Sequence, residues 1–244
     1  MKKNWNSQTI AITGAASGLG KAIAAHFTGL GANVLGLDRN ESDLAAIKKT
    51  IPHGFHPLVC DVTDWPAVEQ AFAKHPVVDV LINSAGITGK TNLKSYETDP
   101  VDVEQVFRVN FFGSYHTSKA VLPGMAARGY GRVLHIASIA GKEGNAGMLA
   151  YSASKAAVIG MAKVQGKEMA GTGVTVNALA PAVIQTPLVE ALPLEQVNYM
   201  TSKIPMQRCA QLEELVSTVE FAVSPGCSFT TGFTFDLSGG RATY

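Results

Sequence analysis

The sequence predicts an α/β fold in which one doubly wound parallel sheet carries helices on both faces. Short apolar runs alternate with longer amphipathic stretches along nearly the whole chain, and this alternation is typical of βαβ units. The runs are almost continuously apolar, as expected of strands that are covered on both faces. The chain has 244 residues, so a single domain, residues 1–244, is the default expectation.

The apolar runs and the amphipathic stretches give the expected elements. The strands are expected at Thr9–Thr13, Asn33–Leu37, Leu58–Cys60, Val78–Ile82, Arg132–Ala137, Thr175–Leu179 and Thr234–Asp236. The helices are expected at Gly18–Leu30, Ser42–Thr50, Pro66–Lys74, Val101–Arg128, Tyr151–Gly171 and Gln211–Val223. One long irregular region, Ala180–Pro205, contains four prolines, and loops of that length are usually functional. A doubly wound sheet binds its ligand beyond the carboxyl ends of its strands, so those ends are the first place to look for a site.

Composition excludes several classes of protein. Hydrophobic residues make up 46% of the chain and charged residues 16%, as in a compact globular protein. Twenty basic residues against nineteen acidic ones give a formal net charge of +1, and no basic run is longer than Lys2-Lys3. We therefore expect neither nucleic acid nor an anionic membrane as a partner. No stretch of about 18 apolar residues occurs, so no membrane-spanning helix is expected.

The termini and the cysteines indicate a cytoplasmic location. The N-terminal segment Met1–Gln8 is polar, so a secretory signal is not expected. The three cysteines, Cys60, Cys209 and Cys227, are widely spaced and form no C-x-x-C pair, which favours free thiols in a reducing compartment. The six histidines show no metal-ligand spacing with one another or with the cysteines, so we predict no metal.

The first predicted strand runs into a glycine-rich segment, Thr13–Gly20. Glycines there let the backbone turn sharply and approach a pyrophosphate, which then lies at the positive end of the following helix. A glycine-rich run alone is weak evidence, but this one follows an apolar strand and opens a helix, which is the context that the motif requires. The residues expected to contact the cofactor here are Gly14, Ser17, Gly18, Leu19 and Gly20.

The second predicted strand is followed by Asp38 and Arg39. A carboxylate at this place can accept hydrogen bonds from both ribose hydroxyls of NAD, and it would repel the 2′-phosphate of NADP. Arg39 could instead hold such a phosphate, so the two residues point in opposite directions. Asp38 lies at the strand end and is given the greater weight, and NAD is therefore the expected cofactor.

Tyr151 and Lys155 carry the predicted catalytic chemistry. Residues four apart share one face of a helix, so the two side chains are expected to lie side by side. A phenol has a pKa near 10, and a neighbouring ammonium, like the positive charge of an oxidised nicotinamide, favours the phenolate. Lowering that pKa to about 7 requires roughly 4 kcal/mol of differential interaction. Ser138, at the end of the fifth predicted strand, is placed to hydrogen-bond the substrate oxygen and position the reacting carbon.

These motifs together resemble those of the short-chain dehydrogenase/reductase family, whose Rossmann-like fold the resemblance also implies. The family's T-G-x-x-x-G-x-G motif matches Thr13–Gly20, and the resemblance covers essentially the whole chain. The family's N-N-A-G element matches Asn83–Gly86, with serine in the second place. Its P-G turn is replaced by Pro181-Ala182. The two departures affect the expected geometry of those loops rather than the chemistry.

The resemblance implies further roles for individual residues. Asp61 and Val62 would bracket the adenine, Asn110 would hold a water that relays protons from Lys155, and Thr186 would contact the nicotinamide carboxamide. In oxidation, Tyr151 would take the proton of a secondary hydroxyl while hydride leaves for NAD. The implied cofactor contacts beyond the glycine loop and Asp38 are Asp61, Val62, Asn83, Ala85, Gly86, Tyr151, Lys155, Ile184 and Thr186. The family also implies a homotetramer, which the sequence alone does not separate from a dimer.

The substrate is indicated by two polar segments. The segment after the serine strand reads Lys142-Glu143-Gly144-Asn145, and the chain ends in S-G-G-R-A-T-Y. Arg241 in that tail can pair with a carboxylate through two parallel hydrogen bonds. Both segments resemble a branch of the family that oxidises sugar acids such as 2-keto-3-deoxy-L-fuconate and 2-keto-3-deoxy-L-rhamnonate. The expected substrate contacts are Ser138, Lys142, Glu143, Asn145, Tyr151, Gln185 and Arg241.

Two other functions remain open at this point. A 3-oxoacyl thioester reductase would share the catalytic motifs, but the acidic Asp38 and the neutral charge balance count against it. A catalytically silent NAD-binding sensor would be expected to lack a catalytic group, whereas Asn110, Ser138, Tyr151 and Lys155 are all present.

Overall fold

A computed structural model describes residues 5–242 and residue 244. The first four residues of Met1–Gln8, on which part of the expectation about a secretory signal rests, lie outside the described residues, and so does Thr243 of the C-terminal tail. Within the described part of the chain, no helix is long and apolar enough to cross a membrane.

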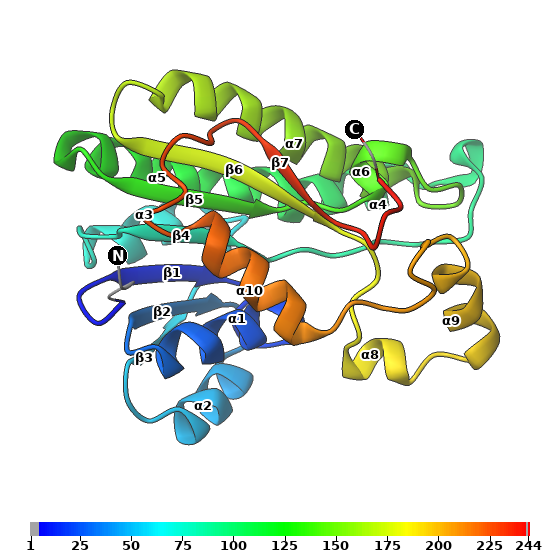
Figure 1. The fold of residues 1–244 in the computed structure, drawn as a ribbon, viewed down its shortest axis with the longest axis horizontal. Helices are drawn as coiled ribbons and strands as arrows, with labels where there is room; N and C mark the ends of the chain where they lie inside the picture. The colour runs from blue at the N-terminus through cyan, green and yellow to red at the C-terminus, as the bar shows by residue number, and fades with distance from the viewer. Residues whose placement is uncertain (1–4, 243) are drawn as a thin grey trace.

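The strands form one parallel sheet, which confirms the predicted fold class (Figure 1). Their bounds are β1 Thr9–Thr13, β2 Asn33–Asp38, β3 Phe55–Val59, β4 Val80–Asn83, β5 Gly131–Ile136, β6 Val174–Pro181 and β7 Thr234–Leu237. The order across the sheet is β3-β2-β1-β4-β5-β6-β7. The strand order reverses between β1 and β4, and a doubly wound sheet binds its ligand beyond the strand ends at that point.

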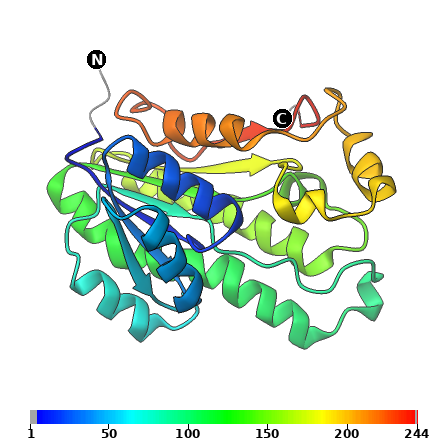
Figure 2. The same cartoon turned by 90° about the horizontal axis from the view of Figure 1, so that it is seen from below.

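The helices cover both faces of the sheet (Figures 1 and 2). Their bounds are α1 Gly18–Gly29, α2 Glu41–Thr50, α3 Trp65–Ala73, α4 Pro100–Phe107, α5 Gly113–Arg128, α6 Ala140–Glu143, α7 Leu149–Met169, α8 Pro187–Glu190, α9 Leu194–Thr201 and α10 Leu212–Ala222, with a short 3₁₀ turn at Ser95–Glu97. One apolar core joins α1, α2 and α10 to the sheet, and a second joins α3 and α5 to its other face.

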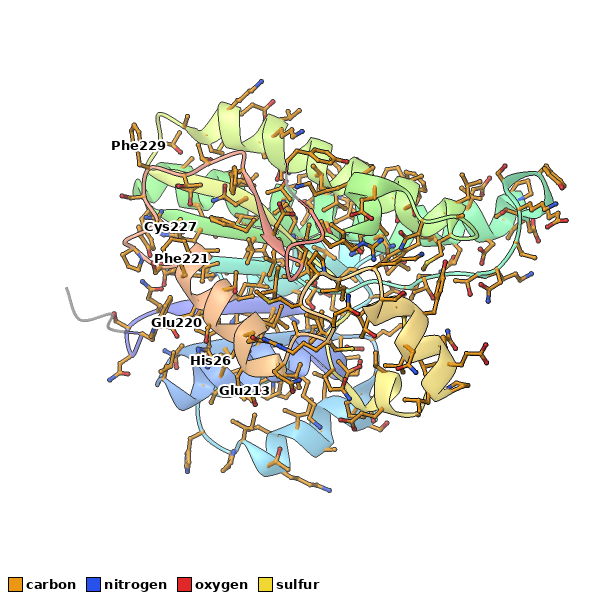
Figure 3. The ribbon with its side chains drawn as sticks, turned by 45° about the vertical axis from the view of Figure 1, so that its right-hand side comes forward. His26, Glu213, Glu220, Phe221, Cys227 and Phe229 are labelled. Atoms are coloured by element: carbon orange, nitrogen blue, oxygen red, sulfur yellow. The ribbon has the colours of Figure 1, made fainter. Side chains whose placement is uncertain are left out.

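Alternate residues of the central strand β1 supply these two cores. Ile10 and Ile12 belong to the core under α1 and α10, whereas Ala11 between them belongs to the core under α3 and α5. This is the period of two expected of a strand covered on both faces. Helices α1 and α10 lie side by side on their face, where Nε2 of His26 and Oε2 of Glu220 are hydrogen-bonded at 2.9 Å (Figure 3).

Two predicted regions differ from the structure in the kind of secondary structure they form. The single helix expected at Val101–Arg128 is interrupted by a π-helical turn, Arg108–Phe112, between α4 and α5. Such turns insert one extra residue into a helix and are frequent at functional sites. The region Ala180–Pro205, expected to be irregular, contains the end of β6 and the helices α8 and α9. Prolines open both helices, since Pro187 is the first residue of α8 and Pro193 precedes α9, positions that tolerate a missing N–H.

The strand β3 begins three residues before the expected Leu58–Cys60. His56 and Pro57 interrupt the apolar pattern there, yet both pair with β2. Because β3 is the edge strand of the sheet, a proline in it can direct its missing N–H away from the ladder at little cost.

Candidate active site

A cavity of about 1090 Å³ runs along the carboxyl ends of the strands. At one end its wall is the loop between β1 and α1, together with the ends of β2 and β3. At the other end its wall is formed by α6, the start of α7, α9 and the C-terminal tail. The predicted cofactor and catalytic residues therefore lie along a single channel at the edge of the sheet where this fold class binds ligands.

The glycine loop is closed tightly enough to require glycine at two positions. An added Cβ at Gly20 would lie 2.2 Å from the carbonyl oxygen of Gly14, and Gly14 itself has a φ of +67°. Ser17 caps α1 without a side-chain hydrogen bond to its first turn, so the cap provides no acceptor for the amides that open this helix. A phosphate placed there would accept hydrogen bonds from these amides.

The end of the cavity near β2 is acidic. Asp38 is held by two backbone amides: its Oδ2 accepts from Ala16 at 3.1 Å and its Oδ1 from Asn40 at 3.0 Å. Asp61 and Val62 line the same end of the cavity, and Val62 packs against Gly113, where an added Cβ would lie 2.6 Å from its Cγ2. The predicted adenosine residues are thus brought together.

Asn83 does not line the cavity, and its predicted contact with a cofactor is not supported by its position. Its side chain is buried beneath the strand ends, where Oδ1 accepts from Thr117 at 2.7 Å and Nδ2 lies 3.2 Å from Nδ1 of His135. Ala85 and Gly86 of the same element do line the cavity. The reason is the alternation of a strand, which turns the Asn83 side chain toward α5.

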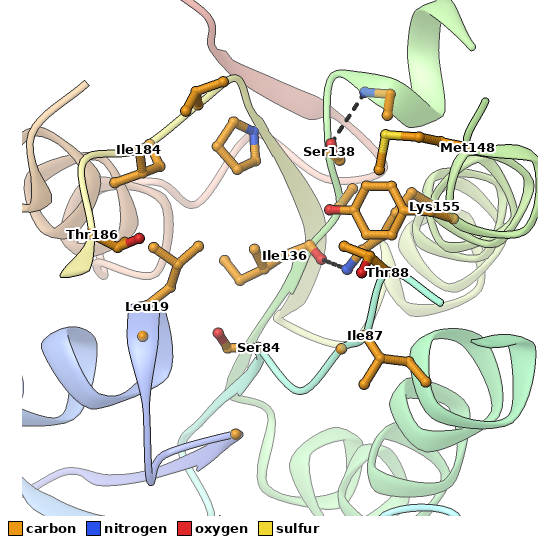
Figure 4. Close-up of a pocket in the computed structure, with 18 of the residues that line it drawn as sticks. Leu19, Ser84, Ile87, Thr88, Ile136, Ser138, Met148, Lys155, Ile184 and Thr186 are labelled. Carbon is orange, nitrogen blue, oxygen red and sulfur yellow. Dashed lines mark hydrogen bonds between the residues drawn. The ribbon is translucent and has the colours of Figure 1, made fainter. Parts of the chain in front are cut away.

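The catalytic candidates converge beyond the end of β5 (Figure 4). Ser138 follows this strand, and its Oγ accepts from the amide of Ala140 at 3.1 Å. Lys155, on α7, donates from Nζ to the carbonyl oxygen of Ile136 at 2.7 Å. Tyr151, one turn earlier, shares a side-chain hydrogen bond with Ser138, and Nζ of Lys155 lies 5.8 Å from the centre of its ring.

The pKa of Tyr151 departs from the sequence prediction. Burial raises the pKa of Tyr151 above its usual value of 10, and the hydrogen bond with Ser138 opposes this shift. Burial therefore opposes the predicted shift, and the lowering that Lys155 and an oxidised nicotinamide would provide together stays a prediction. Desolvation also lowers the pKa of Lys155 to about 8, because burial disfavours the charged form of both groups.

Asn110 lies at the centre of the π-helical turn and is fully buried. Its Nδ2 donates to the carbonyl oxygen of Ile87 at 3.0 Å and to Ser154 Oγ at 2.9 Å, while its Oδ1 accepts from the amide of Ile87 at 2.8 Å. An added Cβ at Gly86 would lie 3.2 Å from Oδ1 of Asn110 and 3.4 Å from Nζ of Lys155. The turn therefore ties the β4 loop to α7 beside Lys155, and the water relay remains a prediction.

The segment after β6 reaches the cavity as the resemblance implies. Ile184 and Thr186 both line it (Figure 4), and the hydroxyl of Thr186 caps α8 by accepting from the amide of Val189 at 3.4 Å. Ile184 forms an isolated parallel bridge with Ala210. The replacement of the family's glycine by Ala182 thus leaves this segment on the cavity wall.

The predicted substrate residues divide into two groups. Asn145 and Arg241 line the main cavity, whereas Glu143 lines only a smaller adjoining one of about 470 Å³. Lys142 and Gln185 line neither, so their positions do not support a contact with substrate. Lys142 lies outside both cavities because its ammonium pairs with Asp236 at 2.8 Å and also binds the backbone oxygen of Tyr244.

Arg241 is held by its neighbours. Its Nε and Nη2 donate to Oε2 of Glu143 at 2.9 and 2.6 Å, and Nη2 also donates to Oδ1 of Asn145 at 3.1 Å. The guanidinium therefore forms part of the wall at the substrate end, and the edge that carries Nε and Nη2 is already hydrogen-bonded to Glu143 and Asn145.

Sequence reasoning missed the contribution of α9. Gln196, Tyr199, Met200 and Lys203 line the cavity from this helix and the turn after it. The only signal was the length of the region Ala180–Pro205, because an amphipathic pattern over the eight residues of α9 is too short to be distinguished from a polar loop.

Comparison with known proteins places this geometry in context. A family model described as short chain dehydrogenase matches residues 8–197. The 2-dehydro-3-deoxy-L-rhamnonate dehydrogenase (NAD(+)) of Sphingomonas sp. is 46% identical over 96% of this chain and 94% of its own length. A 3-oxoacyl-[acyl-carrier-protein] reductase of Thermotoga maritima is 37% identical over 94% of this chain and 95% of its own. The crystal structure of a 3-oxoacyl-[acyl-carrier protein] reductase from Brucella melitensis superimposes with a TM-score of 0.93 at 32% identity, covering 98% of this chain and 93% of its own.

Proposed function

The chain belongs to the short chain dehydrogenase family, and from that premise we propose that it oxidises a secondary hydroxyl of a 2-keto-3-deoxy sugar acid with NAD. It is an oxidoreductase that acts on CH–OH groups. The observation that carries the proposal is one continuous cavity that joins a glycine loop and an acidic strand end to Ser138, Tyr151 and Lys155.

The residues present fit NAD. The Gly14–Gly20 contact leaves no room for a side chain between the loop and the helix start, as the close packing of helix on strand in a dinucleotide-binding turn requires. Asp38 presents a carboxylate fixed by backbone amides, which suits ribose hydroxyls and opposes a 2′-phosphate. A relative that is 46% identical carries NAD(+) in its name. NAD supplies the hydride acceptor and a positive charge when it is bound.

Three side chains of this chain handle the proton and the substrate oxygen. Tyr151 accepts the hydroxyl proton at its phenolic oxygen, and Ser138 holds the substrate oxygen beside it. Lys155, with a pKa of about 8, is mostly protonated at pH 7 and holds its ammonium near the ring. Because burial raises the pKa of Tyr151, the phenolate requires the additional positive charge of the bound cofactor.

The substrate class rests on polarity at the far end of the cavity. Asn145, Lys203 and Arg241 line it, and together they offer an amide and two cations to a hydroxylated carboxylate. The relative from Sphingomonas acts on an acid of this class according to its name.

A 3-oxoacyl thioester reductase is the second candidate. It is favoured by relatives at 34–37% identity that carry this name, and by the structural match at a TM-score of 0.93. The charged substrate end and Asp38 count against it, because an acyl chain favours apolar walls and a carboxylate at this place opposes the 2′-phosphate of NADP.

NADH formation at 340 nm tests the proposal. The substrates are 2-keto-3-deoxy-L-rhamnonate, 2-keto-3-deoxy-L-fuconate, simple aldonates and uncharged secondary alcohols, each with NAD and with NADP. Reduction of an acetoacetyl thioester is measured beside them with NADH and NADPH. The proposal expects turnover of the keto-deoxy acids with NAD; thioester reduction with NADPH as the dominant activity would overturn it.

We further propose that residues 1–244 form one domain that assembles as a homotetramer in the cytoplasm. Exposed apolar side chains support the assembly, because clusters of them mark interaction surfaces. They lie on or beside α4, α5 and α7, at Val101, Phe112, Tyr115, Leu149 and Val164. Three buried free cysteines support a reducing compartment. Light scattering of the purified chain gives the assembly state.

A further inference from the structure

Two cations face the substrate end of the cavity. Lys203, in the turn after α9, and Arg241, in the C-terminal tail, both line the main cavity. They also share the walls of the smaller polar cavity with Glu143 and Asn145. An anionic substrate can therefore meet either cation, and their partners decide which one is available.

Arg241 is already paired with an anion. Two of its nitrogens donate to one oxygen of Glu143, and its side chain is only 10% exposed. A carboxylate approaching this guanidinium would meet the like charge of Glu143 at the same place, which is unfavourable in a partly desolvated site. The pair, with Asn145 as a third member, behaves as a fixed wall that presents polar groups to a sugar.

Lys203 has no anionic partner among the interactions of the described residues. Its Nζ donates to the phenolic oxygen of Tyr199 at 2.7 Å and lies 4.1 Å from the centre of that ring. An ammonium carries three donors, and only one is engaged by Tyr199. The side chain is exposed, so an arriving carboxylate does not have to displace another charge.

We propose that Lys203 binds the carboxylate of the substrate, whereas Arg241, locked to Glu143 and Asn145, supplies fixed polar groups in the same part of the cavity. This proposal rests on the proposed sugar-acid substrate and names the residue that selects its charged end. Lys203, Arg241 and Glu143 leave a net charge of +1 at this end, which matches a monoanion. Tyr199 positions the lysine through an uncharged phenol, so the positive charge of the ammonium is not neutralised.

The test compares an acid with its neutral ester. KM values for 2-keto-3-deoxy-L-rhamnonate and for its methyl ester are measured for the unsubstituted chain and for Lys203→Met, Lys203→Arg and Arg241→Met. Lys49→Met, an exposed lysine on α2 away from the cavity, is the matched control. Thermal unfolding and the KM for NAD are measured for every variant.

We expect the unsubstituted chain and Lys49→Met to prefer the acid. Lys203→Met should raise the KM for the acid about 10- to 100-fold, the range of one charge-assisted hydrogen bond, with the ester, kcat and the KM for NAD little changed. Lys203→Arg should recover most of the loss. Arg241→Met should lower the melting temperature and raise the KM for acid and ester alike.

Three outcomes would overturn the proposal in distinguishable ways. If the unsubstituted chain oxidises the acid and Lys203→Met retains its preference over the ester, Lys203 does not bind the carboxylate. Loss of that preference in Arg241→Met alone would assign the carboxylate to the arginine. If the unsubstituted chain oxidises no sugar acid, the proposed substrate class fails, and the role of Lys203 fails with it.

Discussion

The two ends of the cavity are built in different ways. At the cofactor end, the wall consists of backbone and of side chains held by nearby backbone, as in Gly14, Gly20 and Asp38. At the substrate end, the wall consists of side chains from distant segments, and the Arg241–Glu143 pair joins residues 98 positions apart. The first end depends on local chain geometry, whereas the second depends on the tail, α6 and α9 all being in place.

This difference determines which end of the cavity can change its residues without loss of the fold. A backbone cradle binds a part that many ligands share, such as a pyrophosphate, with few side chains to exchange. Ion pairs between loops can be replaced one residue at a time without disturbing the sheet. Tyr151 and Lys155 lie between the two ends, on the long helix α7.

Replacing Tyr151 with phenylalanine tests whether this residue, between the two ends, accepts the substrate proton. Loss of the phenolic oxygen should lower kcat by roughly 10³- to 10⁴-fold, because general acid–base catalysis contributes about this much. The KM for NAD should change little, since the glycine loop and Asp38 are untouched. Steady-state kinetics and NADH fluorescence titration measure both quantities. Tyr96→Phe, an exposed residue outside the cavity, is the control, and a Tyr151→Phe enzyme with near-normal kcat would refute the assignment.

The buried His135 lies beneath the strand ends, beside Asn83 and Gln165, and gives a prediction about stability. Burial, with a smaller contribution from Lys155, lowers its pKa from 6.5 to about 4, although the hydrogen bond with Gln165 opposes the shift. Thr117 donates to Oδ1 of Asn83 and so fixes the amide with Nδ2 toward Nδ1 of His135. A proton on Nδ1 would place two donors face to face, and the folded chain therefore keeps this imidazole neutral.

The sign of the resulting pH dependence follows from linkage. The unfolded chain binds a proton at His135 near pH 6.5, whereas the folded chain binds it only near pH 4. The stabilisation is thus complete above pH 6.5 and is lost as the pH falls toward 4, by about 3 kcal/mol for a difference of about 2.5 pKa units. Urea unfolding between pH 7 and pH 4 should show this slope, and His135→Gln should flatten it. The exposed His53→Gln should not, and an unchanged slope in His135→Gln would exclude this origin.

The same contrast explains how far the sequence could be read. The fold, the glycine loop, Asp38 and the Tyr151–Lys155 pair follow from local patterns, because strand periodicity and helix spacing act over a few residues. The contacts of Lys142 and Gln185 could not be read from the sequence, because a short polar segment does not reveal which charged groups its side chains meet. Asp236 and Tyr244 bind Lys142 across 94 and 102 positions, and no local pattern encodes such pairing. The pKa of Tyr151 depends on burial, which spacing alone does not provide.

Replacing Asp38 with serine tests whether the cofactor end selects NAD over NADP. The substitution removes the charge that opposes a 2′-phosphate and leaves the neighbouring Arg39 to attract it. The ratio of kcat/KM with NADP to that with NAD should rise roughly 10- to 100-fold, which corresponds to about 1.4 to 2.7 kcal/mol. Glu69→Gln, exposed on α3, should leave the ratio unchanged. If the ratio stays constant in Asp38→Ser, the carboxylate does not select the cofactor.

The smallest expected effect comes from replacing Lys142. It distinguishes a lysine that holds the C-terminal tail from one that contacts the substrate. The side chain of Lys142 is 9% exposed and that of its partner Asp236 is 26% exposed, so the ion pair is only partly screened by solvent. Lys142→Met should lower the free energy of unfolding by about 1 kcal/mol, near the upper range of exposed pairs, because the methionine retains most of the packing.

The kinetic consequence of Lys142→Met should be equally modest. A loosened tail shifts Arg241 slightly, so the KM for a sugar acid should rise only about two- to threefold, a change worth less than 1 kcal/mol. Asp236→Asn should produce the same pair of effects, since it breaks the same contact from the other side. A rise above tenfold for Lys142→Met, with stability and the Asp236→Asn enzyme unchanged, would instead place the lysine on the substrate. The substrate end would then differ in solution from the arrangement in which Lys142 holds the tail.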